Sequence, residues 1–193
     1  MRLLKKGLMS SLALITKVLN VLDGLLDKKV DLFIIGGAAA VLGYGSTRTT
    51  RDIDTWMTVP PEILEKWAEA KRLSGVDLAI DAVSIAQAAY GVEERATLLQ
   101  MPLKNIRVFL PSKEDLILMK ISRFSDNDRE DIAVLIKNCN PEYLLDLYLR
   151  EFIPYAVGNK RMISINYLEM IEGAFGVDVA EGQERVLRAN NYF

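Results

Sequence analysis

With 193 residues, half of them apolar, the chain is long enough for one ordinary globular domain and too hydrophobic to be disordered. It has no histidine and a single cysteine, Cys139, which excludes histidine-based proton transfer, zinc sites built on imidazole and internal disulfides. Its 24 basic and 26 acidic residues leave a net charge of −2, which excludes a broad cationic surface for nucleic acid. Catalysis must therefore use carboxylates, amines, guanidinium groups or hydroxyls, or a metal held by oxygen.

The N-terminal segment superficially matches a signal peptide, because basic residues precede an uncharged stretch over residues 7–16. Lys17 interrupts this stretch, no small-residue cleavage site follows, and the segment is too short to span a bilayer. Apolar residues recur at spacings of three and four from Leu8 to Leu26, which predicts an amphipathic helix packed on the domain. With the near absence of cysteine, we expect a cytoplasmic protein with no membrane partner.

The rest of the chain alternates strands and helices before it becomes helical. Short apolar runs predict four strands, over residues 32–35, 53–59, 76–85 and 106–110. Proline, glycine and N-cap signals predict helices over residues 38–42, 60–73, 113–124, 129–138, 141–152 and 164–173. Residues 86–104 receive no firm assignment, and the polar tail after Gly176 is predicted to have little structure. This order predicts an α/β (α+β) fold, a small mixed sheet with flanking helices: residues 1–138 form the main domain, and 139–193 form a helical C-terminal extension packed on it.

Two aspartates, Asp52 and Asp54, stand at the start of the second predicted strand. Alternate strand residues point to the same side, so the two carboxylates share a face. Adjacent carboxylates repel each other unless a cation, a proton or solvent intervenes. Oxygen ligands of this kind suit Mg²⁺, and two such ions can hold the attacking and leaving oxygens of a phosphoryl displacement. Taken alone, the pair is also typical of a solvent-facing strand end.

Two glycines, Gly36 and Gly37, follow the first predicted strand and open a helix. Glycine permits a sharp turn and a close approach to a ligand, and the helix N-terminus presents unpaired N–H groups that suit a phosphate. Arg48 and Arg51 lie in the loop that leads to the aspartates. Each is a candidate to bind a phosphate or a base, or to pair with the aspartates.

Together, the glycine pair, the Arg-x-Thr-x-Asp-x-Asp segment over residues 48–54 and the strand around Asp81 resemble the DNA polymerase β-like nucleotidyltransferase superfamily. Within it they look most like the small bacterial branch that includes the AbiEii-type toxins. Residues 111–136, with a lysine-bearing helix, a polar turn and an aspartate-containing helix, are also similar to that branch. The resemblance covers about residues 30–138. It implies that the protein binds a nucleoside triphosphate with two Mg²⁺ ions, transfers a nucleoside monophosphate to an acceptor and releases pyrophosphate.

The resemblance also implies roles for individual residues. The catalytic, metal-holding carboxylates are Asp52, Asp54 and Asp81. The nucleotide-binding residues are Gly36, Gly37, Arg48, Thr50 and Lys120. Asp77 shares the strand parity of Asp81, but Asp81 lies between aliphatic pairs and falls where the family carries its third aspartate, so it is preferred as metal ligand and as base toward the acceptor hydroxyl. Many members have Gly-Ser in place of Gly36-Gly37, which removes a hydroxyl contact but leaves the backbone donors.

Other charged and aromatic residues have simpler interpretations. Lys120 lies in an apolar helical stretch, so it either extends from the helix edge into solvent or faces a buried anion. Arg123, Arg129 and the acidic residues between Asp126 and Asp131 are expected on the surface, the acidic ones at a helix start. Core packing is favoured over base stacking for the aromatic residues Tyr44, Trp56 and Trp67.

Three functions remain open at this point. The first is an active transferase whose acceptor is an RNA end, a protein hydroxyl or a small molecule such as an aminoglycoside. The resemblance favours RNA, including tRNA, in a toxin–antitoxin or abortive-infection setting, with a cognate antitoxin and an oligomer as candidate partners. The second is an inactive nucleotide-binding or protein-interaction module of the same fold, which needs no convergence of the three carboxylates. The third is an unrelated α/β protein, favoured if the glycine pair lies far from Asp52.

Overall fold

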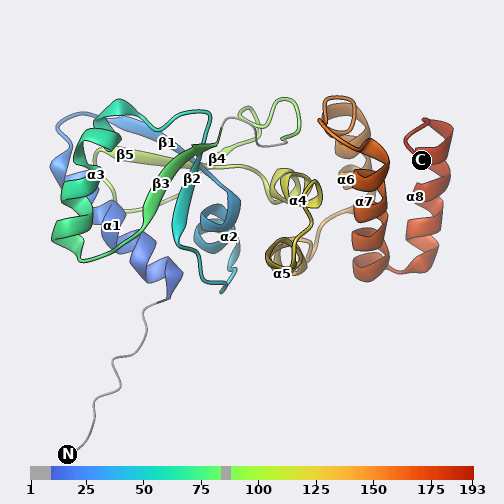
Figure 1. Cartoon of the computed structure of the whole chain (residues 1–193), viewed down its shortest axis with the longest axis horizontal. Coiled ribbons are helices and arrows are strands. Elements are labelled where there is room, and N and C mark those ends of the chain that lie inside the picture. Colours follow the sequence, from blue (N-terminus) through green and yellow to red (C-terminus); the bar gives the residue numbers. More distant parts are fainter. Residues whose placement is uncertain (1–9, 84–87) are drawn as a thin grey trace, which may run out of the picture.

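The structure, a computed structural model, describes residues 10–83 and 88–193 (Figure 1). Its strands are β1 (Val30–Ile35), β2 (Asp52–Trp56), β3 (Ala79–Val83), β4 (Thr97–Leu98) and β5 (Ile106–Leu110). Its helices are α1 (Ser11–Leu25), α2 (Gly36–Tyr44), α3 (Pro61–Ser74), α4 (Lys113–Ile121), α5 (Asp126–Leu135), α6 (Pro141–Leu147), the π-helical segment η1 (Tyr148–Phe152), α7 (Lys160–Phe175) and α8 (Val177–Ala189).

The five strands form one mixed sheet in the order β3-β2-β1-β5-β4. The central strand β1 is antiparallel to β2 and parallel to β5, while β2 and β3 are parallel and β4 and β5 antiparallel. This confirms the predicted mixed sheet. The predicted strands correspond to β1, β2, β3 and β5, and β4 falls in the stretch that received no assignment. The last two residues of the predicted third strand, 84–85, lie outside the described residues.

The N-terminal helix α1 forms because an N-cap and an apolar face coincide. Ser10 caps it by accepting a hydrogen bond from the Ala13 N–H at 3.3 Å. Ile15, Leu19 and Leu22 are completely buried on one face, as their spacing predicts. The start of the predicted apolar face, at Leu8, lies outside the described residues.

The elements are arranged along the long axis of the molecule (Figure 1). The helices α1 and α3 pack against each other at the sheet end, α2 contacts α4 and α5 in the middle, and α7 packs on α8 at the far end. One hydrophobic core connects these parts, from Ile15 in α1 to Leu187 in α8. Within the described residues, no helix combines the length and the hydropathy that crossing a bilayer requires.

The prediction of little structure after Gly176 is wrong, because residues 177–189 form the helix α8. Its buried face includes a polar residue, Gln183, which hides the apolar pattern in the sequence. The Gln183 side chain accepts a hydrogen bond from the Tyr167 hydroxyl at 2.8 Å and donates one to the Pro141 carbonyl at 2.9 Å. These bonds satisfy a polar group that burial would otherwise penalise.

Candidate active site

The helix α2 begins beside β2, the strand that carries Asp52 and Asp54. Its N-cap residue, Ile35, has no side-chain capping bond and stands opposite Asp54 in the β1–β2 register. Gly36 has a φ of +67°, and a Cβ there would lie only 2.6 Å from the Asp54 Oδ2. Glycine is therefore required at Gly36 both by the turn and by the carboxylate beside it. This proximity of the glycine pair to the aspartate strand removes the reason for considering an unrelated α/β protein.

Three of the predicted carboxylates lie on two neighbouring strands. Asp52 and Asp54 alternate with buried residues of β2, so they share the open face. The parallel pairing of β2 with β3 aligns Asp54 with Asp81. Asp77 lies before β3, its side chain is 94% exposed, and it pairs with Lys71. The structure therefore brings Asp81, and not Asp77, into register with the aspartate pair.

The Asp54 carboxylate lies in an environment that disfavours its charge. Burial raises the pKa of Asp54, and the negative charges of Asp52 and Asp81 raise it further, against the weaker opposing influence of Arg123 and Lys120. Within residues 10–83 and 88–193, no ion pair and no side-chain hydrogen bond neutralises this carboxylate. Such a group favours a bound cation.

These aspartates do not form a complete metal site by themselves. In the described part of the chain, no group of three or more Cys, Asp or Glu side chains is close enough together to hold a metal ion. The Asp52 carboxylate accepts a hydrogen bond from the Thr50 hydroxyl at 2.9 Å, and the three like charges repel one another. The full convergence expected of an active transferase is therefore not met. Because Mg²⁺ takes one or two carboxylates together with substrate phosphates, this oxygen donor set still fits an ion held jointly with a triphosphate.

The guanidinium group of Arg48 covers the start of α2. A Cβ on Gly37 would collide with the Arg48 Nη2 and would lie 3.4 Å from the Thr50 Oγ1. Thr50 is itself buried, and its backbone N–H donates to the Ser11 Oγ at 3.0 Å. The structure thus brings Gly37, Arg48 and Thr50 together, while Arg51 in the same loop is exposed.

Lys120 faces a buried anion, which is the second of the two alternatives considered for it. Its side chain is 4% exposed, and its Nζ lies 2.7 Å from the Asp131 Oδ2 and 3.5 Å from the Asp128 Oδ1. Asp131 is fully buried and also accepts bonds from the Ser46 hydroxyl at 2.8 Å and the Arg48 Nε at 3.2 Å. Burial alone would raise the pKa of Asp131, but the bonds from Lys120, Ser46 and Arg48 lower it. The network fixes the loop after α2 to α4 and α5.

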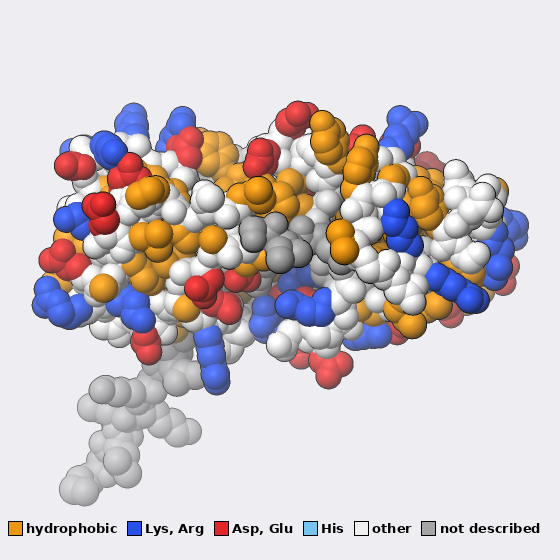
Figure 2. All heavy atoms as spheres, turned by 45° about the horizontal axis from the view of Figure 1, so that its top comes forward, with side chains coloured by type: hydrophobic (Ala, Val, Ile, Leu, Met, Phe, Trp, Pro, Cys, Tyr) orange, Lys and Arg blue, Asp and Glu red, His pale blue; other side chains and the backbone are white. Residues whose placement is uncertain are grey.

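A second buried aspartate, Asp128, holds Arg123 at the edge of the site. Arg123 donates two hydrogen bonds of 2.8 Å to the Asp128 carboxylate, and Ser125 forms a capping box with Asp128. Burial alone would raise the pKa of Asp128, but the bonds from Arg123 and Ser125 and the charge of Lys120 hold it well below its usual range. The Arg123 side chain is 75% exposed, as predicted for a surface charge, and its positive charge reaches Asp54. In the space-filling view, acidic and basic side chains lie beside each other near the middle of the molecule (Figure 2).

The prediction that the acidic residues after Ser125 form a solvated group is therefore wrong for two of them. Asp128 and Asp131 are fully buried, whereas Asp126 and Glu130 are exposed. The spacing of three residues was the available signal, because it places Asp128 and Asp131 on one helix face. Their partners come from the end of the preceding helix, with Lys120 in the last turn of α4 and Arg123 in the turn that follows it.

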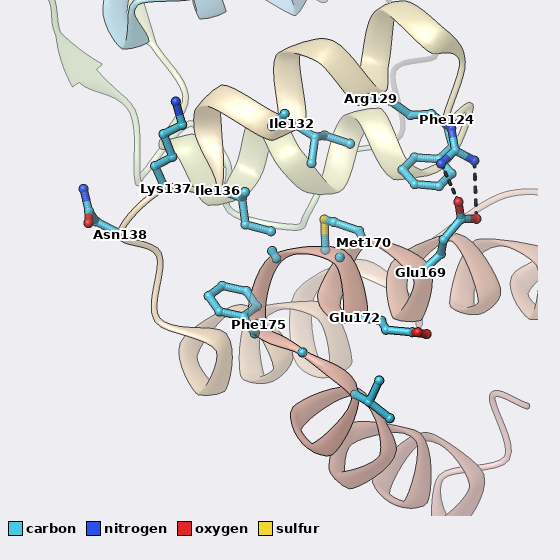
Figure 3. Close-up of a pocket in the computed structure, with 15 residues that line it drawn as sticks. Phe124, Arg129, Ile132, Ile136, Lys137, Asn138, Glu169, Met170, Glu172 and Phe175 are labelled. Atoms are coloured by element: carbon cyan, nitrogen blue, oxygen red, sulfur yellow. Dashed lines mark hydrogen bonds and ion pairs between the residues drawn. The ribbon is translucent and has the colours of Figure 1, made fainter.

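One cavity lies away from these groups, between α5, α7 and the start of α8 (Figure 3). It has a volume of about 860 Å³ and none of the site residues lines it. Arg129, exposed as predicted, pairs with Glu169 at one end of the cavity and lies 3.7 Å from the Phe124 ring centroid. The cavity therefore belongs to the helical half of the molecule and not to the carboxylate site.

Comparison with known families decides the membership of the chain. Residues 10–173 match the model of a family described as "Nucleotidyltransferase of unknown function (DUF6036)". The chain belongs to this nucleotidyltransferase family. No curated protein and no solved structure matches it.

The family match confirms the predicted nucleotidyltransferase resemblance and extends beyond residue 138, through most of α7. All the predicted site residues fall within the matched range. The closer likeness to the AbiEii-type branch stays a prediction.

Proposed function

We propose that the chain is an active nucleotidyltransferase that transfers a nucleoside monophosphate from a nucleoside triphosphate to an acceptor hydroxyl. The observation that carries this proposal is the position of Asp54. Its carboxylate, which no charge partner within the described residues neutralises, lies against the uncapped N-terminus of α2. A carboxylate that favours a cation and a helix end that favours a phosphate then stand next to each other.

The donor triphosphate is held by the N-terminus of α2 together with Arg48, Thr50 and Lys120, which form the basic side of the site. The backbone N–H groups at Gly36 and Gly37 bind phosphate oxygens, and the Arg48 guanidinium and the Thr50 hydroxyl lie beside them. Lys120 adds positive charge from behind Asp131. Asp52 and Asp54 would hold Mg²⁺ together with the phosphates, and the bound ion would neutralise phosphate charge and orient the reacting oxygens.

The acceptor reacts on the Asp81 side. Its hydroxyl oxygen forms a bond to the α-phosphorus, the bond from that phosphorus to the bridging oxygen breaks, and pyrophosphate leaves with the electron pair. Asp81, exposed and in register with Asp54, accepts the hydroxyl proton and returns it to solvent. Nothing in this step requires a histidine, which the chain lacks.

The direct test uses Mg²⁺, each labelled nucleoside triphosphate in turn, and total RNA as well as amine-bearing alcohols as acceptors. The variant Asp52→Ala/Asp54→Ala removes the ion-binding pair, and Asp77→Ala serves as the matched control because Asp77 is exposed and pairs with Lys71. We expect the wild type and the control to transfer label and bind nucleotide, and the double variant to lose transfer by at least about a hundredfold.

Two results would contradict this proposal. Nucleotide binding without transfer to any acceptor would favour an inactive nucleotide-binding module. The absence of both binding and transfer would favour a protein-interaction module.

A further inference from the structure

A second cavity, of about 420 Å³, lies where β2 ends. Trp56, Tyr90 and Tyr155 contribute aromatic rings to it, and Glu93 and Glu94 contribute carboxylates. The expectation of core packing is wrong for Trp56, which lines this cavity and donates its indole N–H to the Glu93 Oε1 at 2.7 Å. By contrast, Trp67 is 8% exposed and belongs to the core, as predicted.

The cavity adjoins the carboxylate site on one particular side. Trp56 follows Asp54 by two residues, so it lies on the same face of β2 and roughly 7 Å further along the strand. Because β1 and β2 are antiparallel, with Ile35 opposite Asp54 and Ile34 opposite Thr55, this direction leads away from Gly36. The donor phosphates and the cavity therefore flank the carboxylates from opposite ends.

Two of the aromatic residues of the cavity stack on each other and stay largely exposed. Tyr90 and Tyr155 stack with their centroids 5.5 Å apart, and their residues remain 66% and 60% exposed. The Tyr90 backbone N–H donates to the Glu151 carbonyl at 2.6 Å, which fixes this pair to η1. Exposed aromatic faces attract cations as well as planar rings.

The charge around the cavity decides between these two kinds of ligand. Glu93 and Glu94 are exposed, and no lysine or arginine is among its described lining residues. The neighbouring Arg95 lies beside Gly91. Its charge is neutralised by the fully buried Asp115, whose carboxylate accepts hydrogen bonds from the Arg95 Nη2 at 2.7 Å and Nε at 3.0 Å. Carboxylates beside aromatic faces favour a cation, and they repel the phosphates of a nucleic acid.

We propose that this cavity is the acceptor subsite and that the acceptor is a small cationic alcohol, such as an amino alcohol or an amino sugar. Its ammonium group lies against the aromatic rings and the carboxylates of Glu93 and Glu94, and its hydroxyl points toward Asp81 and Asp54. This inference rests on the proposed function, because only a transferase needs an acceptor. The bonds formed and broken are those given above, with the acceptor's hydroxyl oxygen as the attacking atom.

The test reads ligand binding directly from Trp56. The chain has two tryptophans, so the variant Trp67→Phe leaves Trp56 as the sole tryptophan, whose emission serves as the reporter. It is titrated with two matched pairs: choline with its neutral isostere 3,3-dimethylbutan-1-ol, and tri-glucosamine with its fully N-acetylated form. We expect the cationic member of each pair to change Trp56 fluorescence and to bind about tenfold or more tightly than the neutral member.

Two variants assign the binding to this cavity. In the same background, Glu94→Gln leaves the Trp56–Glu93 hydrogen bond in place, and we expect it to weaken cation binding several-fold. Glu130→Gln removes an exposed carboxylate on α5 and should leave binding unchanged. Equal binding of the charged and neutral members, no fluorescence change with either, or tighter binding of a single-stranded RNA oligomer would each overturn the inference.

Failure of this inference can be told apart from failure of the proposed function, because the titration needs no nucleotide. If the protein bound nucleotide and transferred label to RNA but did not bind the cationic ligands, only the proposed acceptor class would be overturned. Cation binding without nucleotide binding would overturn the transferase and with it the acceptor role of the cavity.

Discussion

At the scale of single residues, Asp54 costs the folded protein stability when it is ionised. Its pKa is raised by burial and by its two acidic neighbours, so its favourable contribution is present at low pH and is lost as the pH rises through the folded-state pKa. We expect Asp54→Asn to abolish transfer but to raise the melting temperature at pH 8 by roughly 1–2 °C, a modest gain because the side chain is partly solvated. Calorimetry should show this gain shrinking toward pH 4.

A control variant separates this effect from a general response to removing a charge. Asp77→Asn removes an aspartate whose pKa the Lys71 ammonium lowers, so it should bring no gain at pH 8. A lower melting temperature for Asp54→Asn than for the wild type at pH 8 would contradict the argument.

Asp131 is the residue on which the basic side of the site depends. It is fully buried and neutralises Lys120 and Arg48 together. Because Asp131→Asn leaves a buried ammonium group without its closest carboxylate, we expect the free energy of unfolding to fall by about 3–5 kcal/mol. Asp126→Asn, an exposed change on the same helix, should change it by less than about 0.5 kcal/mol. Urea denaturation of both variants measures the difference, and equal stabilities would show that Asp131 does not hold the network together.

The sequence indicates the residues of the site that are close together in the chain. The glycine pair and the alternating aspartates follow local rules of turns and strands, so they can be found from spacing alone. The bond between Ser46 and Asp131 joins residues 85 positions apart, and no local pattern specifies such a contact. The pairing of Ser46 with Asp131 could therefore not be derived from spacing.

At the scale of secondary-structure elements, the N-terminus of α2 can be tested by adding a single methyl group. Gly37→Ala places a Cβ against the Arg48 guanidinium, at the helix end where the phosphates are expected to bind. We expect nucleotide affinity, measured by isothermal titration calorimetry, to fall at least about tenfold while the protein stays folded. Unchanged affinity would contradict phosphate binding at this helix end.

The matched control is the same substitution in another helix. Gly24 lies in α1, and a Cβ added there would have no neighbouring atom within 4 Å, so Gly24→Ala should leave nucleotide affinity unchanged. It should raise stability by about 0.5–1 kcal/mol, because alanine loses less backbone freedom than glycine in a helix.

Helices and strands could be predicted from the sequence where an apolar run or an N-cap residue coincides with a buried segment. The strand β5 and the N-capped start of α4 agree with prediction, since an apolar run and Ser112 specify them locally. The strand β4 has only two residues and pairs with β5, so its existence depends on a neighbour that its own sequence does not reveal. The helix α8 is not evident from its own sequence for a related reason, because its buried face contains Gln183, whose partners belong to other helices.

At the scale of the whole molecule, the helical C-terminal part shares its core with the sheet domain. The Asn166 side chain donates to the Ile121 carbonyl at 2.9 Å, and buried side chains continue without interruption from α1 to α8. We therefore expect the two predicted parts, residues 1–138 and 139–193, to behave as one packed unit. Such a unit is expected to unfold in a single cooperative transition.

Leu187 allows this cooperativity to be tested across the full length of the molecule. It is completely buried in α8, so Leu187→Ala should lower the free energy of unfolding by about 2–4 kcal/mol. Both tryptophans precede residue 138, so their fluorescence reports the sheet domain, whereas circular dichroism at 222 nm reports all the helices. We expect the two signals to share one denaturation midpoint in the wild type and to shift together in the variant. If Leu187→Ala moved only the circular dichroism transition and left the fluorescence midpoint in place, residues 139–193 would be an independent unit, and Tyr155 would belong to a part of the chain that can separate from Trp56.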